Sequence, residues 1–297
     1  GVGKTHLAVN LAVVLSRQGR RVLLIDTDLG SANADLRIGA SPTTTLMDFF
    51  EGRATIECCM TNTNYGFRII AGKPGELALA NLSDEQIIRL LTAFEHLVRN
   101  GGYTDVLFDL GAGISNRVLD FAIVSDEIII VATPNEVIHA YAALKACWNR
   151  FLAVQDREFF KDRVALKKTP FYLRGEYEGG NGAPRINFLV NQVDNLEQGK
   201  KVFLAVSNVV KEFFYTPDSY WKLPMRYLGS VPDVHAFLKQ SERQRIPAAA
   251  LNPYHEFSHA VREVTDILCA KRAIAPGKLQ RSFGDKVKCV LRCWATA

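Results

Sequence analysis

The segment Gly1-Val2-Gly3-Lys4-Thr5, followed at once by a helix-patterned run from His6 to Ser16, decides the fold of this chain. It matches the second half of a phosphate-binding loop, in which backbone N–H groups surround the phosphates of a nucleotide. Glycines permit the close approach, the lysine ammonium bridges the β- and γ-phosphates, and the hydroxyl holds Mg²⁺. We therefore expect nucleotide phosphates at residues 1–5, with His6 at the start of the helix beside them.

A strand and the first half of the loop normally precede such a segment. Neither is present before Gly1. We therefore interpret the chain as a fragment that lacks its N-terminus.

Composition places the chain among globular proteins. It has 297 residues, of which 48% are hydrophobic, so it can bury a large core. Its six cysteines show no paired metal-ligand spacing, and phosphate-binding loops belong mostly to reducing compartments, which favours free thiols. Apolar runs such as Ile128 to Ala132 are far shorter than the roughly 20 residues of a membrane span. We expect a cytoplasmic protein.

Positive charge gathers at the end of the chain. Residues 271–297 carry seven Lys or Arg residues against a single acid, Asp285, whereas the whole chain has a formal charge of +5. The preceding body is therefore close to neutral. A basic tail after a neutral body favours an anionic membrane surface or partner, although a second basic stretch, Arg157 to Arg174, lies within the body.

Helix-patterned and strand-patterned segments alternate along the chain. The strands read as near-continuous apolar runs, which is typical of a parallel sheet covered by helices on both faces. The predicted strands are 20–26, 104–109, 127–132, 186–190 and 225–229, and the predicted helices are 5–18, 85–100, 136–152 and 199–214. The sequence therefore predicts an α/β fold with a mostly parallel sheet, in which ligands bind at the carboxyl ends of the strands.

Two acidic motifs fall at such strand ends. Asp26-Thr27-Asp28 leaves the first predicted strand, and Asp109-Leu110-Gly111-Ala112-Gly113 leaves the second. Carboxylates there can hold Mg²⁺-bound water and orient an attacking water, while the glycines allow the backbone to respond to the γ-phosphate. Each motif taken alone also fits a solvated turn. Their agreement with the phosphate-binding loop predicts a phosphoryl-transfer site.

These residues together resemble the MinD/ParA class of deviant Walker-A P-loop ATPases over residues 1–270. Asp28 to Asp35, Asp109 to Ile114 and Ala132 to Lys145 are most similar to the flagellar-number regulators, the FlhG/FleN/YlxH branch. The segment Val231-Pro-Asp-Val and the later Gln244-Arg-Ile-Pro follow the same branch. The resemblance implies ATP-driven homodimerisation and slow ATP hydrolysis stimulated by a partner protein.

The resemblance also implies roles for single residues. Lys4 would bind the β- and γ-phosphates, Asp28 would orient the attacking water, and Thr5 would ligate Mg²⁺. Asp26 and Asp109 would bind the water around that ion. The nucleotide would further contact Gly1, Val2, Gly3, His6, Asn191, Pro232 and Asp233, with Asn191 reading adenine and Pro232 to Val234 closing over the base. The family's signature lysine would lie two residues before Gly1, outside this sequence, and without it hydrolysis is expected to be impaired.

The basic tail predicts a membrane contact. If residues 281–296 are helical, the side chains at 283, 287, 290, 291 and 294 form one apolar stripe with lysine and arginine outside it, the pattern of an interfacial helix. Residues 271–280 would be the linker. The resemblance supports this prediction, because MinD-like proteins carry such a helix. An ordinary docking helix or a frayed end fits the same residues, since Gly284 and the short length weaken helix formation.

Two further segments need comment. His255-Glu256-Phe257-Ser258-His259 matches the zinc-protease pattern, but it falls on a predicted packing helix with no third ligand in view, so we do not predict zinc there. Residues 154–185 break the α/β rhythm and predict an insertion, a kind of segment that is usually functional or flexible.

Three functions remain open at this point. We favour a Mg²⁺-dependent ATPase that cycles between a soluble monomer and a membrane-attached ATP dimer, and that places or counts a structure such as the flagellum or the division site. The alternative is a ParA-like chromosome or plasmid partitioning ATPase that binds DNA nonspecifically through residues such as Arg157 to Arg174. A nonhydrolysing nucleotide-binding scaffold is the third.

Overall fold

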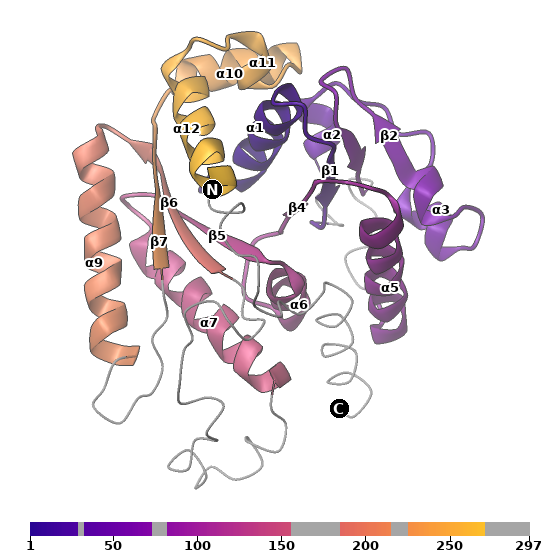
Figure 1. The fold of residues 1–297 in the computed structure, drawn as a ribbon, viewed down its shortest axis with the longest axis horizontal. Helices are drawn as coiled ribbons and strands as arrows, with labels where there is room; N and C mark the ends of the chain where they lie inside the picture. The colour runs from indigo at the N-terminus through magenta and orange to yellow at the C-terminus, as the bar shows by residue number, and fades with distance from the viewer. Residues whose placement is uncertain (29–32, 73–81, 156–184, 215–224, 271–297) are drawn as a thin grey trace, which may run out of the picture. The chain divides into compact units, whose positions relative to one another are not determined.

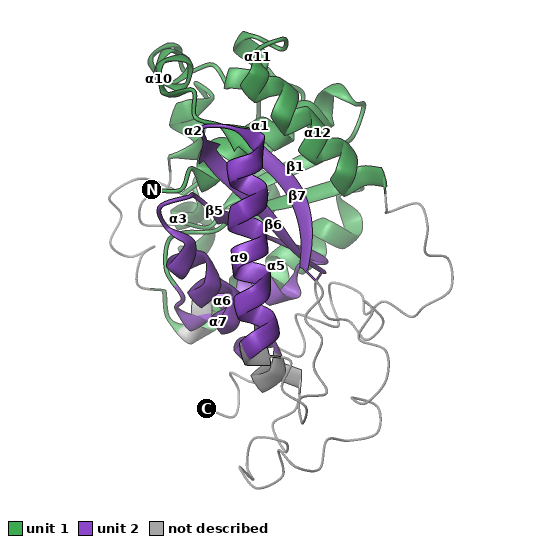
Figure 2. Ribbon diagram, turned by 90° about the vertical axis from the view of Figure 1, so that its left-hand side faces the viewer, with its two compact units in different colours: residues 1–113, 231–271 green, residues 114–230, 272–297 purple. Residues whose placement is uncertain are grey.

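The computed structural model describes residues 1–28, 33–72, 82–155, 185–214 and 225–270 (Figure 1). The chain forms two compact units, coloured separately in Figure 2: residues 1–113 with 231–271, and residues 114–230 with 272–297. The predicted tail at 281–297 and its linker lie outside the described residues. So does most of the predicted insertion, because residues 154 and 155 still belong to a helix and 156–184 are not described.

The first unit is built on a four-stranded sheet in the order β2-β3-β1-β4. The strands β1 (Val22–Asp26), β3 (Arg68–Ile70) and β4 (Asp105–Asp109) run parallel, and β2 (Met60–Asn62) pairs antiparallel with β3. Every residue of β1 is buried, which explains its uninterrupted apolar sequence. The mostly parallel sheet predicted from the sequence is therefore confirmed.

Helix α1 (Lys4–Arg17) is the central helix of this unit and packs against both β1 and β4. It also contacts α11 (Ala248–Leu251) and α12 (Glu256–Ala270), which come from the far end of the described chain. Residues on most sides of α1 are buried, from Leu7 to Leu15, so the helix is enclosed between sheet and helices. This enclosure fixes the start of α1 relative to the ends of the two strands.

The remaining helices of the first unit are short or lie at its periphery. α5 begins with a capping box, in which the Gln86 N–H donates to the Ser83 hydroxyl at 3.3 Å and the Ser83 N–H donates to the Gln86 side chain at 2.8 Å. The other helical elements are α2 (Ala34–Arg37), α3 (Leu46–Phe50), the 3₁₀ turn η1 (Ile56–Cys59), α5 (Asp84–Asn100) and α10 (His235–Gln244).

The second unit holds a three-stranded sheet in the order β5-β6-β7. Its strands are β5 (Glu127–Ala132), β6 (Arg185–Val193), which is parallel to β5, and β7 (Met225–Pro232). Its helices are α6 (Asn116–Val124), α7 (Val137–Gln155) and α9 (Leu196–Phe214). α7 packs on β5 and α9 on β6, so helices flank this sheet as predicted.

A buried ion pair joins two of these helices. Asp120 on α6 is fully buried and accepts two hydrogen bonds from Arg150 on α7, at 2.7 and 2.9 Å. The paired geometry matches the planar guanidinium to the carboxylate and satisfies the buried charge. The pair therefore holds α6 against α7.

Within the described residues, the predicted strands and long helices are present, most of them with shifted ends. The helix predicted to end at residue 152 continues to Gln155, and the one predicted to begin at 199 begins at Leu196. The sequence analysis overlooked β3 and α6, among others. Among the described residues, no helix is long and apolar enough to cross a membrane.

Candidate functional site

The phosphate-binding segment leads directly into α1. Gly3 adopts φ 83° and ψ 25°, the left-handed region that favours glycine, and its carbonyl accepts the Leu7 N–H at 3.0 Å. Lys4 and Thr5 are the first two residues of the helix. The free N–H groups at the start of a long helix attract an anion, so this segment has the backbone geometry of a phosphate site.

Asp26 and Asp109 lie side by side at the carboxyl ends of β1 and β4. They are register partners in the parallel ladder and are 1% and 4% exposed. The backbone between the two strand ends is also tied, because both the N–H and the hydroxyl of Thr27 donate to the Asp109 carbonyl, at 3.0 and 2.9 Å. The structure thus brings both predicted acidic motifs to one edge of the sheet.

Each carboxylate of the pair has a different set of hydrogen bonds. Asp26 accepts three backbone N–H groups, from Asp28 at 3.1 Å, Asn33 at 3.1 Å and Ala34 at 3.2 Å. The Thr5 hydroxyl lies near enough to Asp109 to lower the pKa of that carboxyl, whereas the Asp109 Oδ2 atom is buried without a hydrogen-bond partner among the described residues. Thr5 therefore brings the phosphate-binding segment next to the acidic pair. The Asp109 Oδ2 atom beside it has no hydrogen-bond partner in the part of the chain that the structure describes.

Burial is the main cause that raises the pKa of both acids. Burial, followed by the Asp109 charge, raises the pKa of Asp26 to about 7 despite its backbone hydrogen bonds. Burial also raises the pKa of Asp109 to about 6, opposed by the Thr5 hydroxyl and the Lys4 ammonium. A cation at this edge would relieve the cost of keeping both carboxylates ionised.

Asp28 lies against the second acidic motif. A Cβ atom added to Gly111 would come within 3.2 Å of the Asp28 Cγ atom, so the absence of a side chain at 111 makes room for this carboxylate. Gly113 has φ 103°, a conformation that favours glycine. Gly111 thus leaves room for the Asp28 side chain, and Gly113 allows the backbone to turn.

The donor set suits Mg²⁺ bound to a nucleotide. Hydroxyl and carboxylate oxygens are the ligands of this hard cation, which usually keeps several waters and takes phosphate oxygens as further ligands. Among the described residues, no group of three His, Cys, Asp or Glu side chains could hold a metal by itself. Thr5, Asp26 and Asp109 therefore fit an ion that phosphates and water help to hold.

His6 belongs to a charged cluster that sequence reasoning did not find. Its Nε2 atom lies 2.8 Å from Glu242 Oε1 on α10, and the Arg37 guanidinium contacts both side chains. Burial and the nearby Arg37 charge lower the pKa of His6. The three residues lie 31 and 205 positions apart in the chain, so no local pattern links them.

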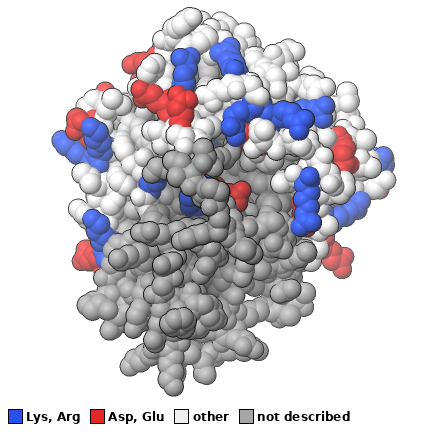
Figure 3. All heavy atoms as spheres, viewed as in Figure 1, with Lys and Arg blue, Asp and Glu red and all other residues white. Residues whose placement is uncertain are grey.

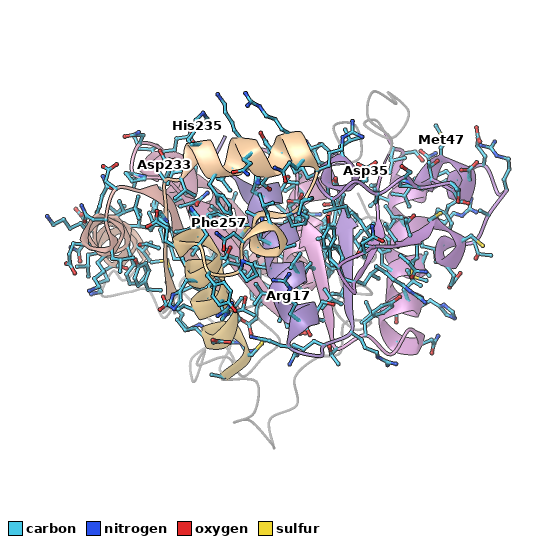
Figure 4. The ribbon with its side chains drawn as sticks, turned by 90° about the horizontal axis from the view of Figure 1, so that it is seen from above. Arg17, Asp35, Met47, Asp233, His235 and Phe257 are labelled. Carbon is cyan, nitrogen blue, oxygen red and sulfur yellow. The ribbon has the colours of Figure 1, made fainter. Side chains whose placement is uncertain are left out.

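The predicted base-contacting residues lie in different parts of the fold. Asn191 is buried near the end of β6 in the second unit, next to Gln192, which has φ 58°. Pro232 ends β7 and Asp233 is exposed just before α10, where Figure 4 labels it together with His235. Their predicted contacts with the base stay predictions.

The two histidines of the zinc-protease pattern have separate partners. The His255 ring stacks on Phe237 with 3.7 Å between ring centroids, and His255 lies before the start of α12. His259 Nδ1 lies 3.4 Å from Glu263 on the helix surface. These contacts are those of packing and surface residues.

Comparisons with known proteins identify a nucleotide-binding family. A family model described as the CobQ/CobB/MinD/ParA nucleotide binding domain matches residues 1–248. The antiactivator FleN of Pseudomonas aeruginosa is 29% identical over 248 residues, covering 82% of this chain and 74% of FleN. The flagellum site-determining protein YlxH of Helicobacter pylori is 24% identical over 273 residues, covering 91% of this chain and 79% of YlxH.

Solved structures share the fold. The septum site-determining protein MinD from Pyrococcus horikoshii, complexed with Mg-ADP, aligns with a TM-score of 0.65 at 19% identity, over 92% of this chain and 93% of that chain. The cobyrinic acid a,c-diamide synthase of Mycobacterium smegmatis, with an ATP analogue and magnesium, aligns with a TM-score of 0.61 at 15% identity, over 95% and 94%.

Proposed function

The chain belongs to the CobQ/CobB/MinD/ParA nucleotide-binding family, and from that premise we propose that it is a Mg²⁺-dependent ATPase that regulates the placement or number of flagella from the membrane surface. One observation carries the ATPase part. Asp26 and Asp109 meet in register beside the start of α1, where the Thr5 hydroxyl lies near Asp109. Phosphate-binding backbone, a hydroxyl ligand and paired carboxylates thus occupy one edge of the sheet.

The residues of this edge divide the work of phosphoryl transfer. Lys4 and the first N–H groups of α1 hold the phosphates and neutralise charge that develops on them. Thr5, with Asp26 and Asp109 acting through water, would hold Mg²⁺, which supplies electrostatic stabilisation of the transferred phosphoryl group. Asp28, placed beside Gly111, orients the attacking water. In this proposal, the residues catalyse ATP hydrolysis by positioning the phosphates and the water and by neutralising the charge that develops.

The regulatory part rests on the relatives. YlxH is named as a flagellum site-determining protein and FleN as an antiactivator, and their similarity spans 91% and 82% of this chain. Dimerisation with ATP, membrane attachment through residues 281–296 and a stimulating partner protein complete the proposal. The solved MinC:MinD complex from Aquifex aeolicus, which covers 94% of this chain at a TM-score of 0.60, shows that a protein of the same fold binds a partner protein.

A partitioning ATPase that binds DNA is the second candidate. The ParA protein of Caulobacter vibrioides is 32% identical, but over 139 residues that cover 44% of this chain. On the face seen in Figure 3, acidic and basic side chains of the described residues are interspersed, which does not favour a polyanion on that face. The shorter similarity and this charge pattern place the DNA-binding function second.

Sedimentation with liposomes distinguishes the two candidates. The full-length protein and a form ending at Lys271 would be pelleted with anionic vesicles in ATP or ADP, with duplex DNA as competitor. ATP-dependent pelleting that is lost with the tail supports the membrane regulator. ATP-dependent DNA binding without pelleting supports the partitioning ATPase. Phosphate release is measured in the same samples, and its absence in every condition would overturn the ATPase proposal.

A further inference from the structure

The cluster of His6, Arg37 and Glu242 joins three elements of the first unit beside the phosphate-binding segment. His6 is on the first turn of α1, directly after Thr5, whereas Arg37 ends α2 and Glu242 lies in the last turn of α10. The three side chains are 17%, 26% and 44% exposed. Figure 4 shows α10 running from His235 toward Asp35 of α2. The Glu242 carboxylate thus lies between His6 of α1 and Arg37 of α2.

Hydrogen bonds continue from this cluster to the acidic pair. Arg37 Nε donates to Asn33 Oδ1 at 3.0 Å, and the Asn33 N–H donates to Asp26 Oδ2 at 3.1 Å. The next N–H, that of Ala34, donates to the same oxygen at 3.2 Å. The position of α2 therefore determines two of the three N–H groups that Asp26 accepts.

The beginning of α1 is also held to α11, at a point separate from Glu242. Asn10, which is 1% exposed, donates to the His6 carbonyl at 2.7 Å and accepts the Ala249 N–H at 2.7 Å. α1 is thus fixed independently of Glu242. α2, in contrast, contacts α10 and the residue that follows it through the Arg37–Glu242 pair and the approach of Gly39 to Arg245. Loss of the Glu242 charge should consequently move α2 more than α1.

We propose that Glu242 is a positioning residue for the magnesium-dependent part of nucleotide binding, acting through Arg37 and Asn33 on Asp26. Its carboxylate holds Arg37, Arg37 holds Asn33, and the Asn33–Ala34 backbone holds Asp26 in the orientation that the ion requires. His6 keeps the same carboxylate beside the phosphate-binding helix. This inference rests on the proposed ATPase function and extends it to residues outside the site itself.

The test compares nucleotide affinity with and without Mg²⁺ in the full-length protein. For each variant, the dissociation constant of a fluorescent ATP analogue is measured with Mg²⁺ and with EDTA, and the ratio is the value in EDTA divided by the value with Mg²⁺. We expect Glu242→Gln to reduce this ratio about threefold to tenfold while the value in EDTA stays nearly unchanged. A purely structural role would instead lower the melting temperature and leave the ratio as it was.

Three further variants identify the route. Arg37→Lys keeps the positive charge but removes the Nε donor to Asn33, so it should reduce the ratio as well. The double variant Arg37→Gln/Glu242→Gln should have no larger effect than the stronger of its two single variants, Arg37→Gln and Glu242→Gln, because both residues act in one path. Glu242→Asp, which retains the charge, should recover part of the ratio. Additive effects would overturn the proposed path.

Glu263→Gln is the matched control, since it removes the same charge from another His–Glu contact, that of His259 and Glu263 at 3.4 Å on the surface of α12. It should leave the ratio unchanged. A wild-type ratio in Glu242→Gln, or an equal loss in Glu263→Gln, would overturn the inference alone. An unmodified protein whose ATP affinity does not respond to Mg²⁺ would overturn the proposed function as well.

Discussion

Asp26 and Asp109 are register partners at the ends of two parallel strands, both almost fully buried. Both carboxylates lose hydration in this position, and the Asp109 charge also acts on Asp26, so the pKa values of both groups are raised. Without a bound cation, the pair therefore destabilises the folded state at neutral pH. The same arrangement favours a divalent ion when nucleotide is present.

Replacing Asp26 with Asn should stabilise the nucleotide-free protein at pH 8 by about 1–3 kcal/mol. The pKa of Asp26 is raised from 3.8 to about 7, so the folded state holds a proton that the unfolded state releases, and stability falls as pH rises between these values. At pH 5 the wild-type acid is already neutral and the difference should shrink. Urea unfolding at both pH values measures this, and equal stabilisation at pH 5 and 8 would contradict it.

Asp48→Asn offers a control of opposite sign. Asp48 is half-buried, and hydrogen bonds from the Thr45 N–H and from Arg53 lower its pKa. Its ionised form is thus favoured in the folded state, so its replacement should give no stabilisation at pH 8.

Thr5→Ala should weaken binding of ATP with Mg²⁺ by about 10- to 100-fold and leave binding in EDTA nearly unchanged, because the proposed role of the lost hydroxyl is to ligate the ion. Lys4→Ala should weaken both, since the ammonium contacts the phosphates directly. Titration of fluorescent ATP in the two conditions separates these effects. Equal losses in both conditions for Thr5→Ala would argue against its place at the ion.

Asp28→Ala should lower the rate of ATP hydrolysis by about 10²- to 10⁴-fold, with ATP affinity little changed, because this carboxylate orients the water. Gly111→Ala should have a weaker effect of the same kind, since the new methyl group would lie 3.2 Å from the Asp28 Cγ atom and displace it. Single-turnover phosphate release and equilibrium binding are the measurements. A variant that loses affinity but not rate would show that Asp28 has another role.

Asp120→Ala should destabilise the protein by up to about 3–5 kcal/mol, because it leaves the half-buried Arg150 charge without the Asp120 carboxylate. Arg150→Ala should do the same from the other side. The double replacement Asp120→Leu/Arg150→Met should be far less damaging, since neither charge then remains. Urea unfolding of the three variants compares them, and a double variant as unstable as the singles would refute this account.

Much of the fold and the site could be predicted because their signals are local. The Gly-Lys-Thr segment, the apolar run that becomes β1 and the acids that end β1 and β4 each lie within a few consecutive residues. Parallel strands place their carboxyl ends at one edge, so two local motifs on neighbouring strands meet without further information. The prediction of Asp26 and Asp109 as neighbours is confirmed by their register.

Short elements escaped prediction for a physical reason. β3 has three residues, too few to show a period, and only its neighbours β1 and β2 stabilise it as a strand. α6 follows a Gly-rich turn, and its Ser115 side chain caps it by accepting the Val118 N–H at 3.4 Å. Its nine residues span fewer than three turns, so amphipathic periodicity is weak there.

The sequence by itself determined the chemistry of the nucleotide site, because phosphate-binding backbone, hydroxyl and carboxylates must occur in short fixed patterns to do their work. Only the tertiary structure decided that Glu242 would meet His6 and Arg37, and that Gly111 would make room for Asp28. Such contacts join residues far apart in the chain and depend on how helices pack on the sheet. No local propensity encodes that packing, since the burial of apolar surface over the whole unit selects it.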